Sequence, residues 1–250
     1  MHDMLYGRQP IYEALHARRR AFRRVVMAEG VQESGIVAEI RTLADSLGLP
    51  IARVPRDRLD DLAGTTHHQG VALEAGPYPY APMDEALALA ATRAEPPFFL
   101  LLDLLQDVQN VGGLLRTAEA VGVHGVVLQE RRAAGITPAV VAASAGAVEH
   151  LLITQVTNLV QAMRALKEAG VWLAGLESAP EAARYDLANL TGPLGVVVGS
   201  EGEGLRTLVR ETCDFLIRLP MRGRVASLNA AAAGSIALYA AWAARGFSGG

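Results

Sequence analysis

The sequence is nearly without two residue types that often carry recognisable chemistry. It contains one cysteine, Cys213, and one lysine, Lys167, among its 250 residues. A single cysteine excludes an intramolecular disulfide and any zinc site built on cysteines, and it suits a reducing cytoplasm, which is the location we expect. We expect the lone thiol to pack in the interior and not to act as a nucleophile.

The sequence also lacks a segment that would place the chain in a membrane. Its longest apolar tract, residues 230–244, is mostly alanine and is shorter than the roughly 18 residues that a spanning helix needs. The N-terminal MHDMLYGRQP has no basic start followed by an apolar core, so no secretory signal is expected. With 51% hydrophobic and 20% charged residues, the composition is that of a soluble globular protein without a membrane partner.

Strong net charge is absent too, since the formal charge is only −3, but the basic residues are unevenly distributed. The stretch RRRAFRR is dense in arginine, at Arg18, Arg19, Arg20, Arg23 and Arg24. Two interpretations stay open. One is a solvated helix end. The other is an RNA-contacting patch, because arginine offers a planar fork to phosphate and can stack on exposed bases.

The order of predicted elements indicates an α/β protein with two parts. Residues 1–75 form a small α/β unit, with helices predicted over 8–17, 33–47 and 56–62 and strands over 22–28, 51–54 and 70–75. Residues 76–97 are rich in proline and are interpreted as a linker that holds a short helix over 84–93.

From residue 98 to the end, strands and helices alternate. The predicted strands are 98–103, 124–129, 150–154, 171–176, 194–200 and 215–220, and a helix is predicted over 158–170. Most of these strands are continuous apolar runs, which is typical of parallel strands that are covered on both faces. We therefore expect a parallel sheet in residues 98–250.

Polar residues and glycines gather in three loops that follow predicted strands. In QNVGGLLRTAEAVG, Asn110 can cap a helix, two glycines bare its first turn, and Arg116 follows in the second turn. VVVGSEGEGL contains Gly199 and Glu201, but its glycines do not follow the dinucleotide-binding order. In LPMRGRVASLNAAAAG, Ser227 or Asn229 opens a helix whose small residues permit close packing.

The common catalytic motifs are missing from the sequence. There is no nucleophile elbow, no H-E-x-x-H, no P-loop and no C-x-x-C. The residues by themselves therefore predict a polar, glycine-rich site at strand ends that binds a ligand not dominated by phosphate.

Together these segments resemble a known family. QNVGGLLRTAEAVGVHGVVL, SAGAVEH, VVVGSEGEGL and LPMRGRVASLNAAAAGSIAL are similar, in order and spacing, to the motifs of the SpoU (TrmH-like) family of SPOUT methyltransferases. YGRQPIYEAL and HHQGVALE resemble the small L30e-like RNA-binding domain of the rRNA members. The combination looks most like the 23S rRNA guanosine 2′-O-methyltransferases of the RlmB type.

The resemblance implies a fold and a reaction. The reaction is methyl transfer from S-adenosylmethionine to a ribose 2′-hydroxyl of 23S rRNA, in a guanosine of the peptidyl-transferase region. The fold is a C-terminal SPOUT domain with a trefoil knot behind the L30e-like domain, and the enzyme is a homodimer with the cofactor site near the subunit contact.

The resemblance also assigns residues to roles. Those matched to catalysis are Arg116, Asn110, Glu201, Ser227 and Asn229, and those matched to the cofactor are Gly199, Leu219 and Leu228. His68 and Gln69 join the five arginines as predicted RNA-binding residues. His67 and His68 are adjacent and cannot easily share one metal ion, so no metal site is expected.

Alternatives remain on two points, namely which group accepts the proton of the 2′-hydroxyl and which RNA is the substrate. A guanidinium has a pKa above about 12 and rarely gives up its proton, so our hypothesis makes Arg116 an electrostatic anchor for the alkoxide and not a base. Alternative substrates are tRNA or a 23S rRNA adenosine. A non-catalytic RNA-binding protein on the same fold is the alternative from another class, and a redox enzyme is disfavoured because the G-x-G-x-x-G turn is missing.

Overall fold

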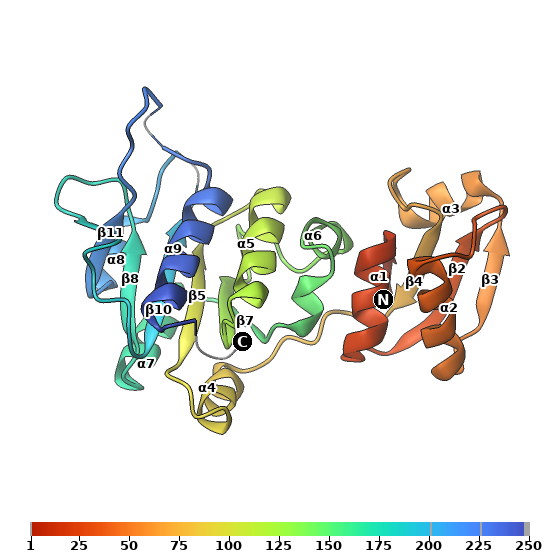
Figure 1. Ribbon diagram of the computed structural model, residues 1–250, viewed down its shortest axis with the longest axis horizontal. Helices are drawn as coiled ribbons and strands as arrows, with labels where there is room; N and C mark the ends of the chain where they lie inside the picture. Colours follow the sequence, from red (N-terminus) through yellow and green to blue (C-terminus); the bar gives the residue numbers. More distant parts are fainter. Residues whose placement is uncertain (1, 201, 226, 248–250) are drawn as a thin grey trace. The chain divides into compact units, whose positions relative to one another are not determined.

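A computed structural model describes residues 2–200, 202–225 and 227–247 (Figure 1). The chain divides into two compact units. The N-terminal unit consists of the residues up to Pro79 together with Ile136–His150, and the C-terminal unit begins at Tyr80 and holds the remainder. Within the described ranges, no helix combines the length and the apolar character that crossing a membrane requires.

The N-terminal unit is built on a four-stranded sheet within the described residues, in the order β1-β4-β2-β3. Its strands are β1 (Asp3–Tyr6), β2 (Phe22–Ala28), β3 (Ile51–Val54) and β4 (Val71–Ala75), and its first helices are α1 (Arg8–Ala17), α2 (Ile36–Ser46) and α3 (Arg56–Ala63). Only β2 and β3 pair in parallel. Each element expected in this part is present, and β1 is an addition that the sequence did not predict.

A segment from the middle of the chain completes the N-terminal unit. It contains α6 (Pro138–Ala143) and the short 3₁₀ helix η1 (Ala147–His150), which pack against β1 and α1. The predicted division into 1–75, 76–97 and 98–250 assigned this segment to the C-terminal domain, so its grouping differs from the expectation. The expected strand over 150–154 is also corrected, because β7 spans Ile153–Val156.

The chain reverses sharply between α6 and η1. Ala145 and Gly146 have φ angles of 52° and 86°, so two successive residues adopt the left-handed conformation. A Cβ on Gly146 would lie only 2.7 Å from the Cβ of Glu13 on α1. Glycine is therefore required for η1 to approach α1 this closely.

The C-terminal unit contains a seven-stranded sheet within its described residues, in the order β7-β6-β5-β10-β8-β11-β9. Besides β7, the strands are β5 (Phe98–Asp103), β6 (Gly125–Gln129), β8 (Trp172–Leu176), β9 (Ala183–Arg184), β10 (Leu194–Gly199) and β11 (Phe215–Arg218). Every neighbouring pair is parallel, as the apolar runs predicted. The trefoil knot stays a prediction.

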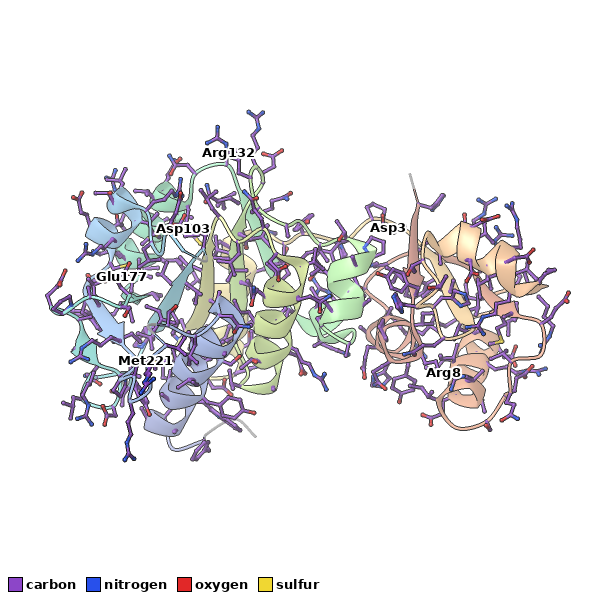
Figure 2. All side chains as sticks on the ribbon, turned by 90° about the horizontal axis from the view of Figure 1, so that it is seen from above. Asp3, Arg8, Asp103, Arg132, Glu177 and Met221 are labelled. Atoms are coloured by element: carbon purple, nitrogen blue, oxygen red, sulfur yellow. The ribbon has the colours of Figure 1, made fainter. Side chains whose placement is uncertain are left out.

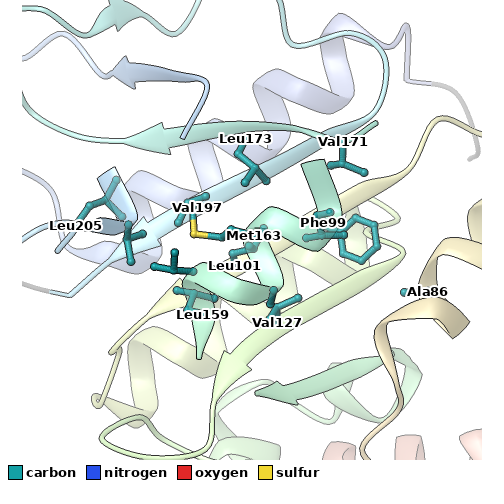
Figure 3. Packing of buried hydrophobic residues seen from close by; sticks show 14 residues of the cluster. Ala86, Phe99, Leu101, Val127, Leu159, Met163, Val171, Leu173, Val197 and Leu205 are labelled. Atoms are coloured by element: carbon teal, nitrogen blue, oxygen red, sulfur yellow. The ribbon is translucent and has the colours of Figure 1, made fainter. Parts of the chain in front are cut away.

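Helices cover both faces of this sheet. They are α4 (Met83–Thr92), α5 (Val108–Ala120), α7 (Leu159–Glu168), α8 (Thr207–Thr212) and α9 (Ala230–Ala244). On one face Leu101 and Val197 pack against Met163 of α7 (Figure 3). Ala86 of α4 belongs to the same core, so part of the predicted linker is an integral element of this unit.

On the other face, α5 and α9 lie side by side (Figure 1). The hydroxyls of Thr117 and Ser235 join the two helices at 2.7 Å. A Cβ on Gly234 would lie 2.4 Å from Leu114 Cδ2 and 3.2 Å from Val198 Cγ2. The small residues of α9 therefore allow it to pack closely on both α5 and β10.

Candidate functional site

A cavity of about 470 Å³ lies in the C-terminal unit, where β8, β10 and β11 end. It is the position at which open α/β sheets bind ligands. Five of the residues predicted to form the site line it together: Gly199, Leu219, Ser227, Leu228 and Asn229. The structure thus brings all three predicted cofactor residues to one place.

The glycine-rich loop forms one wall of the cavity by folding back on the end of β10. Gly204 N donates to Ser200 O at 3.0 Å, and the two residues form an isolated antiparallel bridge. A Cβ on Gly199 would lie 2.3 Å from the backbone carbon of Gly204, so no larger residue fits here without moving the loop. The predicted Glu201 lies outside the described residues.

Glu177 is a lining residue that the sequence analysis missed. Its backbone N donates to Ile217 O at 2.9 Å, and its Oε2 accepts from Leu205 N at 3.3 Å (Glu177 and Met221 are labelled in Figure 2). Among the described lining residues it is the only charged one. The cavity therefore favours a ligand with a positive charge or with hydroxyl and amine donors. The sequence feature that could have identified Glu177 is its position directly after the apolar run VWLAGL.

Two asparagines cap the first turn of α9. Asn229 is the N-cap, and its side chain accepts from Ala232 N at 2.8 Å. Asn110 reaches across from α5, and its Oδ1 accepts from Ala231 N at 3.3 Å. Satisfying these otherwise unpaired N–H groups fixes the start of α9 beside the cavity.

The expectation that Asn110 caps α5 was wrong. Asp107 is the N-cap, and its Oδ1 accepts from Asn110 N at 2.7 Å. A carboxylate is the better partner here because its negative charge also complements the positive end of the helix dipole. This leaves the buried amide of Asn110 available for α9.

Arg116 does not join the cavity within its own chain. It is exposed on the third turn of α5 and is absent from the lining residues. Of the predicted catalytic residues, Ser227 and Asn229 line the cavity, Asn110 contacts the helix that borders it, and Arg116 stands apart.

Arg206 holds the far end of the glycine-rich loop. Its backbone N donates to Asp103 Oδ2 at 2.9 Å and its Nε to Asp103 Oδ1 at 2.7 Å, while Nη2 donates to Gln129 Oε1 at 2.9 Å. Asp103 and Gln129 are buried at the ends of β5 and β6 (Asp103 is labelled in Figure 2). This network fixes the loop against the two strands, and no sequence motif predicted the pairing.

The thiol of Cys213 behaves as a packed side chain. It is half-buried, and its Sγ donates to Val209 O at 3.3 Å. Burial, reinforced by the negative charge of Asp214, raises the pKa of Cys213 to about 12. The thiolate is therefore scarce at neutral pH, in agreement with the expected packing role.

The predicted RNA-binding arginines separate into two groups, and the first is internal to the N-terminal unit. The side chain of Arg20 is fully buried and donates to both carboxylate oxygens of Glu149, at 2.7 and 3.0 Å, and to Asp3 at 3.2 Å. Arg19 hydrogen-bonds to the Tyr78 hydroxyl and to the carbonyl of Glu149. Both arginines hold the unit together in the structure.

The second group reaches the surface. Arg18 is exposed, and Arg23 and Arg24 both donate to the carboxylate of Glu74, at 2.9 and 2.8 Å. Burial raises the pKa of Glu74, but the hydrogen bonds from Arg24 and Arg23 outweigh it and hold the pKa below its usual value. A single carboxylate thus serves two guanidinium groups, which remain partly exposed.

His68 and Gln69 have structural contacts in this unit. His68 is fully buried, with Nδ1 accepting from Gly70 N at 2.9 Å and Nε2 lying 2.6 Å from Asp60 Oδ1, so its ring does not face solvent. Gln69 is exposed, but its Oε1 accepts from Arg8 N at 3.0 Å and caps α1. Of the two, only Gln69 is at the surface.

Comparison with known families identifies the chain. A family model described as the SpoU rRNA methylase family matches residues 97–239. The chain belongs to the SpoU family. A second model, described as the substrate-binding domain of RNA 2′-O ribose methyltransferases, matches residues 4–81. The two matches correspond to the two parts that the sequence motifs indicated.

Relatives of this SpoU chain match along its whole length. A Bacillus subtilis protein named putative TrmH family tRNA/rRNA methyltransferase YacO is 42% identical over 240 residues, which cover 95% of this chain and 94% of the relative. The crystal structure of the SpoU methyltransferase AviRb from Streptomyces viridochromogenes in complex with AdoMet has a TM-score of 0.78 at 24% identity, covering 99% of this chain and 91% of that one. A solved RNA 2′-O ribose methyltransferase has a TM-score of 0.75 at 25% identity, covering 97% and 88%. The predicted α/β fold with a parallel C-terminal sheet is confirmed, and the trefoil knot stays a prediction.

Proposed function

We propose that this SpoU protein transfers a methyl group from S-adenosylmethionine to the 2′-hydroxyl of a guanosine in the peptidyl-transferase region of 23S rRNA. The observation that supports it best is the cavity at the ends of β8, β10 and β11, which gathers Gly199, Leu219 and Leu228. The substrate-binding family match over residues 4–81 supports RNA as the substrate.

The charge of the cavity and its side-chain-free glycine wall support S-adenosylmethionine as the ligand. Glu177 supplies the single negative charge among the described lining residues, which complements a sulfonium or an amino group. Gly199 and Gly204 keep the wall free of side chains, so that backbone N–H and C=O groups face the ligand together with those of Leu219 and Leu228. When bound, the cofactor supplies a methyl group that is already activated by the positive charge on its sulfur.

The residues of the chain then have to activate the ribose hydroxyl. Ser227 and Asn229 lie in the cavity wall and orient the ribose by hydrogen bonds. Arg116 stabilises the developing alkoxide, and its permanent charge makes it an electrostatic anchor, while the proton leaves to water or to the adjacent phosphate.

A homodimer accounts for the position of Arg116. Within its own chain this arginine is exposed and lies outside the cavity wall, so a second copy that presents its own α5 supplies the missing cation. Exposed apolar side chains on α9, Ile236 and Tyr239, offer surface for such a contact.

The test is transfer of labelled methyl from S-adenosylmethionine to transcribed 23S rRNA and to bulk tRNA, followed by nucleoside mapping. We expect label in a 2′-O-methylguanosine of 23S rRNA. Arg116→Ala should lose at least about 100-fold in rate, whereas Arg164→Ala, which changes an exposed arginine on α7, should leave the rate unchanged. Label only in tRNA would keep the reaction and overturn the substrate.

The pH dependence separates the two roles considered for Arg116. If the 2′-hydroxyl loses its proton late and without a side-chain base, the rate of the wild-type enzyme should still rise above about pH 9. A rate that is flat from about pH 6 upward would contradict the anchor role. The measurement is a single-turnover rate at saturating cofactor across this range.

A further inference from the structure

Three side chains that the methyl-transfer site does not use meet in the N-terminal unit. Glu13 and His16 lie on α1, and His150 is the last residue of η1. Each offers one ligand atom, and these atoms all lie within 4.8 Å of one another. His150 Nε2 is 2.9 Å from Glu13 Oε2, and the rings of His16 and His150 meet edge to face with centroids 6.2 Å apart.

The frame that holds these donors is rigid. Glu13 and His16 are three residues apart on one helix, a spacing that places both side chains on the same face. The residue before His150, Glu149, is locked by its paired hydrogen bonds to the buried Arg20. The buried ion pair therefore holds the backbone next to His150, and the contacts with Glu13 and His16 orient its ring.

Neighbouring side chains orient two of the donors. Gln9 Nε2 donates to Glu13 Oε1 at 2.6 Å, which leaves Oε2 directed at His150. The ring of Tyr12 stacks on that of His16, with centroids 5.9 Å apart. Metal-binding residues commonly have such supporting contacts, which set the direction of the lone pairs.

Two imidazoles and one carboxylate are a donor set that suits zinc and similar divalent transition metals. Donors in such a site lie about 2.0–2.2 Å from the ion, so small side-chain rotations from the present spacing are sufficient. An ion pair between Glu13 and His150 explains only two of the three groups, and both are partly exposed, so that pair adds little stability. It gives no reason for His16 to face them.

We propose that Glu13, His16 and His150 bind one divalent transition-metal ion of the zinc class, with water in the fourth position. The ion would fasten η1 to α1, two segments that lie far apart in the sequence. The expectation that the chain binds no metal rested on residues that are close in the sequence, above all His67 and His68, whereas this site joins donors that only the fold brings together.

The test uses the full-length protein after treatment with EDTA. Isothermal titration with Zn²⁺ should give one site per chain, and a thermal melt should show a higher Tm with one equivalent of Zn²⁺ than without metal. His16→Gln should weaken the affinity by roughly tenfold or more. His67→Gln, which replaces an exposed histidine elsewhere in the unit, should keep the wild-type affinity and the wild-type shift.

His16→Gln is the decisive variant because it leaves the hydrogen bond between Glu13 and His150 intact. Its Tm in EDTA should equal that of the wild type, so that a lost response to zinc reports the site and not the fold. Co²⁺ binding, followed by its visible absorption, should show the same difference between His16→Gln and His67→Gln. No saturable zinc binding by the wild type, or equal binding by wild type and His16→Gln, would overturn the proposal. Methyl transfer is not part of this readout, so failure here is distinct from failure of the proposed function.

Discussion

At the scale of single residues, the cavity depends on the absence of a side chain as much as on the presence of one. Gly199 has an ordinary backbone conformation, so it is required only because the chain of Gly204 lies where its Cβ would be. Glycine in that loop was visible in the sequence, but the close approach that makes it necessary arises from the fold.

Gly199→Ala should therefore weaken binding of S-adenosylmethionine by at least about tenfold and lower the free energy of unfolding by about 1–3 kcal/mol, the usual cost of overpacking. Gly223→Ala is the matched control, because a Cβ there meets nothing within 4 Å. Calorimetric titration and chemical denaturation measure the two effects. Equal behaviour of both variants would show that the loop moves freely and that the close approach is unimportant.

Cys213 allows a second prediction at this scale. Because burial raises its pKa to about 12, the thiol should react with a thiol-specific reagent at pH 8 at least about 100-fold more slowly in the folded protein than in urea. The rate of labelling in each state is the measurement. Rapid labelling of the native protein would mean that the thiol is accessible and that its packing role is wrong.

At the scale of elements, the sequence predicted the long apolar strands well and the short edge strand β1 poorly. The apolar sequence runs that form β5, β8 and β10 indicated buried parallel strands, and the structure confirms these strands. β1 was missed because only Leu5 in it is buried, which leaves too short a pattern to detect. The contact of η1 with α1 was out of reach as well, since it depends on residues distant along the chain.

The link from the glycine-rich loop to β5 and β6 is testable at this scale. Arg206→Ala removes side-chain hydrogen bonds from the buried carboxylate of Asp103, and it should cost about 1–3 kcal/mol of unfolding free energy and weaken cofactor binding. Arg210→Ala removes only an exposed ion pair with Glu181, and it should cost at most about 1 kcal/mol. Denaturation curves and cofactor titrations of both variants decide the point, and indistinguishable effects would rule out a positioning role for Arg206.

At the scale of the whole molecule, the property to test is the oligomeric state. Ile236 and Tyr239 on α9 are 40% and 47% exposed, on a helix that is rich in alanine. If a homodimer forms through this helix, Ile236→Glu should yield monomers by sedimentation and lose methyl transfer. Leu187→Glu changes a side chain that is 74% exposed in a loop and should remain dimeric and active. A wild-type protein that sediments as a monomer at micromolar concentration would contradict the homodimer.

Residues 136–150 lie in the middle of the sequence but belong to the N-terminal unit, and this determines how the chain can be cut and recombined. The polypeptide passes between the two units at residues 79–80, again at 135–136 and a third time at 150–151. A single protease cut in the proline-rich stretch would thus leave two fragments that are still tethered and still share the pairing of Arg20 with Glu149. Transfer of the N-terminal unit to another SpoU enzyme requires two separate sequence segments. Deleting only the residues up to Pro79 would remove α1, against which η1 packs.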